Sequence, residues 1–300
     1  MPSASKLPFL ALAAAGCFWG TGFVFGKIAL QEVSVPHMIL YRFWFACAGL
    51  VLVLMRSHTA PMVRDLPAIV LAGVIGVPIV FLIQFEGLAR TSVAHASLMV
   101  GTFPMLLALA ALLFLRERLD GPGWLAILGS TAGAALIVAG SRHAISRTSV
   151  PTARGDLLVL LSLLGAVAWV LISKGLLRRY SPVVATAYVY LAGTVVLTAW
   201  VWLKNGAPPW RLSAATWLAM AAQGLVATVL SSLLWNWGLT KVPAARAGIF
   251  VNFEPLLGSI LGMILFGDRL GLPGFAGGAL ILASAVLLSA HGPAESPAPL

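Results

Sequence analysis

The chain repeats part of itself, without a gap, at an offset of 151 residues. Residues 87–124 read GLARTSVAHASLMVGTFPMLLALAALLFLRERLDGPGW, and residues 238–275 read GLTKVPAARAGIFVNFEPLLGSILGMILFGDRLGLPGF. Shared Leu and Ala positions mean little in apolar sequence, but Pro104 falls on Pro255, and Glu117-Arg118-Leu119 falls on Asp268-Arg269-Leu270. A fixed internal period of this kind indicates that the two halves are related copies.

Composition places both copies in a membrane. Hydrophobic residues make up 60% of the 300 residues and charged residues only 9%, whereas about a quarter of a soluble domain is charged. So little charge cannot cover a water-facing surface, and lipid must supply the outer solvent. Most Lys and Arg residues behind the net charge of +10 lie in short gaps between apolar stretches. Such loops face anionic headgroups, so nucleic acid is not an expected partner.

Ten apolar segments are long enough to cross a bilayer as helices, which takes about 20 residues. The segment 142–155, with three Arg residues, is the expected connector between the copies. We therefore expect an all-α integral membrane fold with five-helix repeats at residues 1–145 and 151–290 and a disordered tail at 291–300. The ten segments cover residues 8–30, 36–55, 66–88, 93–115, 122–141, 156–177, 183–203, 213–238, 243–266 and 272–290.

An odd number of helices per copy has a consequence for orientation. The second copy must enter the membrane in the opposite sense to the first, so the repeats are expected to be inverted around a central cavity. Inverted repeats are a recurrent transporter design, because exchanging the conformations of the two copies turns an inward-open cavity outward. With both termini inside, ten Lys and Arg residues lie in inner loops against seven in outer loops, or nine if Lys27 and Arg42 are added. The positive-inside rule alone does not fix the orientation.

The chain resembles the EamA family of the drug/metabolite transporter superfamily. The matching elements are Phe18-Trp19-Gly20, Arg42-Phe43, and the repeated block in which Pro104 or Pro255 precedes an acid-Arg-Leu triplet. This resemblance implies ten helices in a bacterial inner membrane, cytoplasmic termini, and a cavity lined by helices one, three, four, six, eight and nine. Overall likeness is to YddG-type exporters of aromatic amino acids and methyl viologen. The first helix lacks the carboxylate of the small multidrug antiporters, so their proton exchange is not expected here.

Glu254 lies near the middle of the segment 243–266, where a charge is costly unless it is paired, hydrated or neutralised. It should therefore face the bundle interior or a watery cavity. Two interpretations stay open. Glu254 binds a substrate ammonium or carries a proton, or it is a protonated or hydrogen-bonded packing group beside Pro255. The first copy has Phe103 in its place, so polar asymmetry in the cavity is expected here.

Amide and aromatic side chains are the other candidates for the cavity. Gln84 has Trp235 as its counterpart in the repeat, and an amide facing an indole would suit an amino acid with an apolar side chain. Trp19 and Trp169 occupy corresponding regions of the first helix of each copy, and Gly20 allows close approach of backbone or ligand. Aromatic residues in spanning helices more often face lipid or the core. The remaining aromatic candidates are Phe81, Phe250 and Phe253.

Polar residues near helix ends also have two interpretations. His95 shares a helical face with Met99 and Thr102, which could line the cavity. However, His95 and its repeat counterpart Arg246 both begin a spanning segment, where anchoring at the interface is the default role.

Lys27 and Arg42 could attract a substrate carboxylate. They could instead pair with Glu32 and outer-leaflet phosphates, which is the commoner arrangement. Pro78, Pro104 and Pro255 interrupt spanning segments and are candidate hinges, with static kinks as the equal alternative.

The sequence lacks the motifs typical of metal binding, nucleotide binding and catalysis. No second His or Cys stands at ligand spacing, and Cys17 and Cys47 lie in apolar segments, so no metal site is expected. The motif GxxxxGK[ST] and any Ser-His-Asp, HExxH or paired-carboxylate constellation at membrane depth are absent from the sequence. Neither a cofactor nor enzymatic activity is therefore expected.

The sequence thus predicts a secondary or facilitated transporter, an alternating-access exporter of amino acids, aromatic or otherwise apolar, and related small metabolites. Its expected partners are this substrate and the lipid bilayer, and the expected unit is a monomer. One alternative is an exporter of other metabolites or toxic organic cations. A membrane-embedded enzyme or a channel is less favoured, because a channel would need a continuous polar pore.

Overall fold

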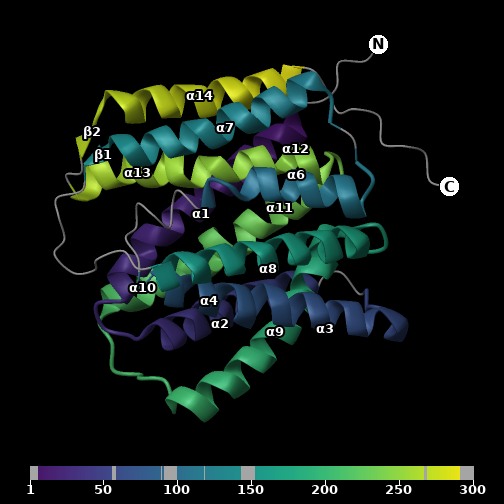
Figure 1. Ribbon diagram of the computed structural model, residues 1–300. Helices are drawn as coiled ribbons and strands as arrows, with labels where there is room; N and C mark the ends of the chain where they lie inside the picture. The colour runs from purple at the N-terminus through teal and green to yellow at the C-terminus, as the bar shows by residue number, and fades with distance from the viewer. Residues whose placement is uncertain are drawn as a thin grey trace.

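The computed structural model describes residues 6–55, 59–88, 90, 100–117, 119–142, 153–266 and 269–290. Nearly all of them form helices that run side by side in one bundle (Figure 1). The two-residue strands β1 (Ser141–Arg142) and β2 (Arg269–Leu270) pair antiparallel at one end. The α-helices are α1 (Leu7–Ala29), α2 (Val35–Leu54), α3 (Leu66–Val74), α4 (Val80–Leu88), α6 (Phe103–Phe114), α7 (Gly121–Gly140), α8 (Ala153–Leu177), α9 (Pro182–Asn205), α10 (Ala214–Gly224), α11 (Ser231–Leu239), α12 (Ala244–Ala247), α13 (Phe253–Phe266) and α14 (Leu272–Ala290).

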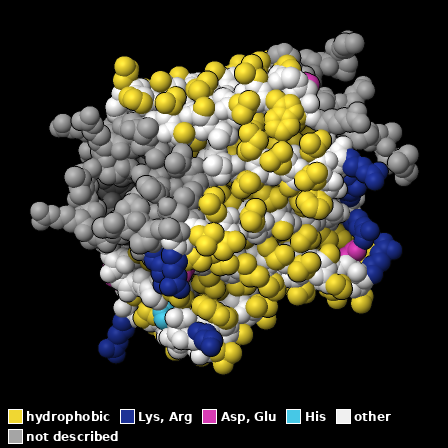
Figure 2. Space-filling view, viewed as in Figure 1, with side chains coloured by type: hydrophobic (Ala, Val, Ile, Leu, Met, Phe, Trp, Pro, Cys, Tyr) yellow, Lys and Arg dark blue, Asp and Glu magenta, His cyan; other side chains and the backbone are white. Residues whose placement is uncertain are grey.

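Length and composition confirm a predominantly helical membrane protein. Within the described residues, six helical spans are long and apolar enough to cross a bilayer, and they cover Leu7–Gly26, Val35–Leu54, Val63–Gly87, Leu157–Leu177, Pro182–Asn205 and Ala214–Leu239. Figure 2 shows hydrophobic side chains over the middle of one face, with Lys and Arg gathered towards its edges. The exposed apolar side chains include Leu52, Leu113 and Val195. Exposure of such side chains to water is unfavourable, so we expect lipid to surround them.

Local sequence explains where several helices begin. Ser181 caps α9, because its hydroxyl accepts a hydrogen bond from the Val184 amide at 3.3 Å, and Ser213 caps α10 in the same way through Thr216 at 3.2 Å. Pro182 occupies the first helical position, where its missing N–H costs nothing.

Three spans contain turns that are not α-helical. Residues Ile75–Ile79 and Leu225–Leu230 each form a π-helical turn, and Gly248–Asn252 forms a 3-10 turn between α12 and α13. The sequence predicted continuous helices there, and the differences have local causes. Pro78 lacks an N–H inside the first π-helical turn, and the Thr228 hydroxyl bonds to the Gln223 carbonyl at 2.9 Å in the second.

Two glycines make matching contacts with opposite halves of the chain. A Cβ on Gly73 would lie 2.4 Å from the Val189 oxygen of α9, and a Cβ on Gly224 would lie 2.5 Å from the Arg42 oxygen of α2. Gly73 and Gly224 are 151 positions apart. Helix α3 thus packs closely on α9, and α10 packs closely on α2.

The pairs α2 with α9 and α7 with α14 run antiparallel. Along α2, Trp44 contacts Thr198 and Cys47 contacts Thr194, so the partner number falls as the first number rises. Along α7, Gly129 lies against Ser284 and Gly133 against Gly277. In Figure 1, α1 begins and α14 ends at the same side of the bundle.

Candidate functional site

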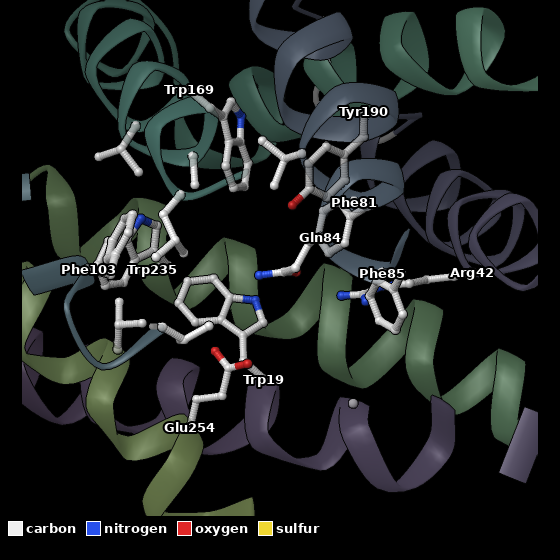
Figure 3. A pocket seen from close by; sticks show the side chains of 17 residues that line it. Trp19, Arg42, Phe81, Gln84, Phe85, Phe103, Trp169, Tyr190, Trp235 and Glu254 are labelled. Atoms are coloured by element: carbon white, nitrogen blue, oxygen red, sulfur yellow. The ribbon is translucent and has the colours of Figure 1, made fainter. Parts of the chain in front are cut away.

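A cavity of about 120 Å³ lies inside the bundle, between helices of both halves (Figure 3). At about 10–15 Å³ for each water, that is room for several waters or one small organic molecule. The lining residues come from α1, α2, α4, α6, α8, α9, α11 and α13 and from the segments next to them. Six of the residues predicted for the cavity line it: Trp19, Phe81, Gln84, Trp169, Trp235 and Glu254.

Aromatic rings form a large part of the cavity wall. The indoles of Trp19 and Trp235 lie 5.2 Å apart between ring centroids, and Trp169 stacks on Tyr190 at 6.1 Å. Ring pairs at these separations attract one another beyond simple burial, which holds the rings in place. A wall of this kind fits an apolar or aromatic ligand group.

Arg42 supplies a buried positive charge. Its side chain is 5% exposed, its Nε donates to the Thr228 hydroxyl at 2.6 Å, and one Nη donates to the Ala227 carbonyl at 3.3 Å. The guanidinium carbon also lies 4.5 Å from the centre of the Phe81 ring, a favourable cation–π distance. Arg42 therefore belongs to the cavity wall and not to the outer ends of the helices.

Arg42 and Glu32, which could have formed an ion pair, do not pair in the structure. Glu32 accepts a hydrogen bond from the Ser213 amide at 2.8 Å, at the turn between α1 and α2. Hydrogen bonds from Ser213 hold the pKa of the Glu32 carboxyl below its usual range. Glu32 therefore ties this turn to the start of α10.

Glu254 brings a carboxyl group to the same cavity. It is partly buried in the first turn of α13, and no described residue donates a hydrogen bond to its carboxylate. Gly20 packs below it, since a Cβ on Gly20 would lie 2.8 Å from the Glu254 backbone oxygen. The close contact between α1 and α13 thus brings Trp19 beside the carboxylate, as Figure 3 shows.

The other predicted residues lie elsewhere. Phe250 and Phe253 stack on one another at 5.9 Å, and Phe250 also contacts Phe9, so both pack within the bundle. Thr102 directly precedes α6 and does not line the cavity. His95 and Met99 lie outside the described residues.

Sequence reasoning missed some lining residues that the repeat could have revealed. Three pairs related by the 151-residue offset line the cavity: Gln84 with Trp235, Val100 with Val251, and Phe103 with Glu254. Phe103 could have been found in this way, because its counterpart was already a candidate. Tyr190, whose hydroxyl meets Ser232 at 2.5 Å, had no such signal.

The three prolines predicted as hinges lie at helix starts or in a π-helical turn. Pro104 lies in the first turn of α6, Pro255 lies in the first turn of α13, and Pro78 lies within the π-helical turn of the third span. In each case the missing N–H falls where the regular α-helical pattern is already interrupted.

Ion pairs join the two halves at one end of the bundle. Lys174 of α8 pairs with Glu117, and the other oxygen of Glu117 accepts from the Ala245 amide at 3.0 Å. Beside them, Arg246 pairs with Asp120 at 2.9 Å. Arg246 is 1% exposed, so it is buried here and does not anchor at the interface. Segments before α7, at the end of α8 and in α12 are thus held together.

No group of three or more His, Cys, Asp or Glu residues that could hold a metal ion occurs within the part of the chain that the structure describes. The charged groups of the cavity are an arginine and a glutamate, which suit binding of an organic ion.

Comparison with known proteins identifies the class. The EamA-like transporter family matches residues 6–139 and again residues 153–290. The chain belongs to the EamA-like transporter family, a family of membrane transporters that carry small molecules. The family and the names of the relatives below agree with the expectation of a transporter.

Relatives cover nearly the whole chain at low identity. An uncharacterized transporter of Archaeoglobus fulgidus is 27% identical over 94% of this chain and 96% of its own length, and the uncharacterized transporter YetK of Bacillus subtilis is 24% identical over 91% and 84%. A probable terminal-alkyne amino-acid exporter of Streptantibioticus cattleyicolor is 25% identical over 90% and 89%. One solved structure superposes with a TM-score of 0.79 at 17% identity over 95% of this chain and 97% of that chain, which shows a shared fold.

Proposed function

We propose that this protein is an alternating-access exporter of amino acids, aromatic or otherwise apolar, and of related small metabolites. The cavity carries this proposal, because residues of both halves enclose a space with aromatic walls and two opposite charges. Membrane binding sites are expected near the bilayer midplane at the interface of two repeats. The similarity to a probable terminal-alkyne amino-acid exporter of Streptantibioticus cattleyicolor supports amino acids as the substrate class.

We further propose that residues 1–145 and 151–290 are inverted five-helix repeats. The matching contacts of Gly73 and Gly224 support this, since a two-fold relation between the halves turns each contact into the other. Counterpart helices that pack antiparallel, α2 on α9 and α7 on α14, support it as well. The expected tail at 291–300 lies outside the described residues.

In alternating access, the cavity opens to one side of the membrane while the helix ends on the other side close it. The pairs of Lys174 with Glu117 and Arg246 with Asp120 hold the halves together at the end where α1 begins. With both termini in the cytoplasm of a bacterium, this contact closes the cytoplasmic side. Pro78, Pro104 and Pro255 are the proposed bending points, because the regular helical pattern is interrupted at each.

Uptake into proteoliposomes tests the proposed function. Purified protein, reconstituted as a monomer at low density, is given a panel of labelled amino acids with and without a proton gradient. Saturable uptake of apolar amino acids is the expected result. Uptake of a toxic organic cation alone would replace the substrate class, and non-saturable flux of small ions would favour a channel.

A further inference from the structure

We infer that Arg42 and Glu254 form a two-point site for the head group of an α-amino acid, in which Arg42 binds the carboxylate and Glu254 binds the ammonium. This inference rests on the proposed function and specifies what its cavity selects. It predicts a preference for zwitterions over organic cations and organic anions of the same shape.

Contacts with neighbouring residues stabilise the positive charge of Arg42 inside the bundle. Hydrogen bonds to Thr228 and Ala227 fix two of its three nitrogens, and Phe81 lies against the guanidinium. The remaining Nη has no hydrogen-bond partner among the described residues, and no described carboxylate pairs with the side chain. A buried guanidinium with a free N–H and no carboxylate at salt-bridge distance is matched by a ligand carboxylate.

Glu254 is the complementary group. Its carboxylate reaches the same cavity from α13 and receives no hydrogen bond from any residue that the structure describes. The interpretation as a hydrogen-bonded packing group therefore lacks a donor. A carboxyl group at membrane depth that no described residue hydrogen-bonds is matched by a ligand ammonium.

The two charges lie on different sides of one cavity. In the view of Figure 3, Trp19 lies beside Glu254, and the Arg42 guanidinium is directed towards the Gln84 amide. A zwitterion offers a group of opposite charge to each residue, whereas a cation or an anion leaves one of them unmatched. The rings of Trp19, Trp169 and Trp235 then take the apolar side chain.

Three probes of one shape separate these charges: phenylalanine, phenylalaninamide, which lacks the carboxylate, and 3-phenylpropionate, which lacks the ammonium. Their affinities are measured from quenching of tryptophan fluorescence, and their transport is measured by counterflow against labelled phenylalanine. Phenylalanine is expected to bind at least tenfold more tightly than either analogue, because each analogue leaves a built polar group unpaired.

The variants assign each charge to its residue. Arg42→Gln should bring phenylalanine and phenylalaninamide to within about twofold of each other, and Glu254→Gln should do the same for phenylalanine and 3-phenylpropionate. Arg42→Lys keeps the charge without the planar fork and should keep part of the selectivity. Glu86→Gln and Arg90→Gln, which alter an exposed ion pair away from the cavity, are the controls and should keep the wild-type ratios.

Two results overturn the inference. Wild-type protein that binds and transports all three probes equally well has no head-group selection, although it remains a transporter. Folded Arg42→Gln and Glu254→Gln proteins that keep the wild-type ratios would also overturn it. If Arg42→Gln does not fold, the wild-type ratios and those of Arg42→Lys and Glu254→Gln decide. Absence of transport for every solute is a different outcome, because it removes the proposed function.

Discussion

The thiol of Cys47 donates a hydrogen bond to the hydroxyl of Thr194 at 3.2 Å. In the proposed inverted repeat these two residues are counterparts. Ser34 and Ser181, which precede α2 and α9, are 147 positions apart, and so are Cys47 and Thr194. Two residues that a two-fold axis exchanges and that contact each other must lie next to that axis. The proposed inverted repeat therefore has its axis at this contact between α2 and α9.

Cross-linking tests the position of this axis. In a protein with Cys17→Ser and a protease site inserted between residues 143 and 152, Thr194→Cys should form a disulfide with Cys47 under a lipid-soluble oxidant. After cleavage, the halves should stay joined on a non-reducing gel. The control is Thr198→Cys, which faces Trp44 and should not join the halves. Equal cross-linking in both variants would contradict the register.

Gly73 and Gly224 should be the positions of α3 and α10 least tolerant of a side chain. A Cβ at either site would lie within 2.5 Å of a backbone oxygen, and backbone cannot move aside as a flexible side chain can. Gly73→Ala and Gly224→Ala should each destabilise the protein by about 1–3 kcal/mol, as overpacking does, and lower the Tm in detergent. Gly175→Ala is the matched control, because its Cβ would meet nothing within 4 Å. A Tm that rises in all three variants would rule out these close contacts.

The sequence predicted the membrane class, the helical fold and the family because these follow from composition, segment length and the 151-residue repeat. Apolar periodicity says how long a helix is but not which turn within it is irregular, so the π-helical turns of the third and eighth spans were missed. The sequence leaves two roles open for Arg42, binding of a substrate carboxylate or pairing with Glu32 and lipid phosphates. Its place in the cavity depends on Thr228 and Phe81, which are remote in sequence and meet only in the fold.

Glu32 should make stability depend on pH in the acid range. Hydrogen bonds from Ser213 lower the pKa of this carboxyl in the folded protein, so its contribution is complete above the unfolded pKa of about 4.3. The contribution is lost as the pH falls through the folded pKa. Between about pH 5 and pH 3, the Tm of wild-type protein should fall more steeply than that of Glu32→Gln. Parallel curves for the two proteins would show that Ser213 does not favour the ionised carboxyl.

Lys174 and Glu117 should control opening at the end where α1 begins. Their side chains are 14% and 12% exposed, and Glu117 also accepts from the Ala245 amide, so loss of the pair should favour the open state by about 1 kcal/mol or more, which is about fivefold. Ala245→Cys, in a protein without Cys17 and Cys47, reports this opening through its rate of labelling by a membrane-impermeant maleimide. Glu117→Gln and Lys174→Gln should each speed labelling about fivefold, and the exchange Glu117→Lys with Lys174→Glu should restore much of the protection. Glu86→Gln, which alters only the exposed pair with Arg90, should label at the parent rate. Labelling that stays slow in both single variants would mean that this ion pair does not hold the end closed.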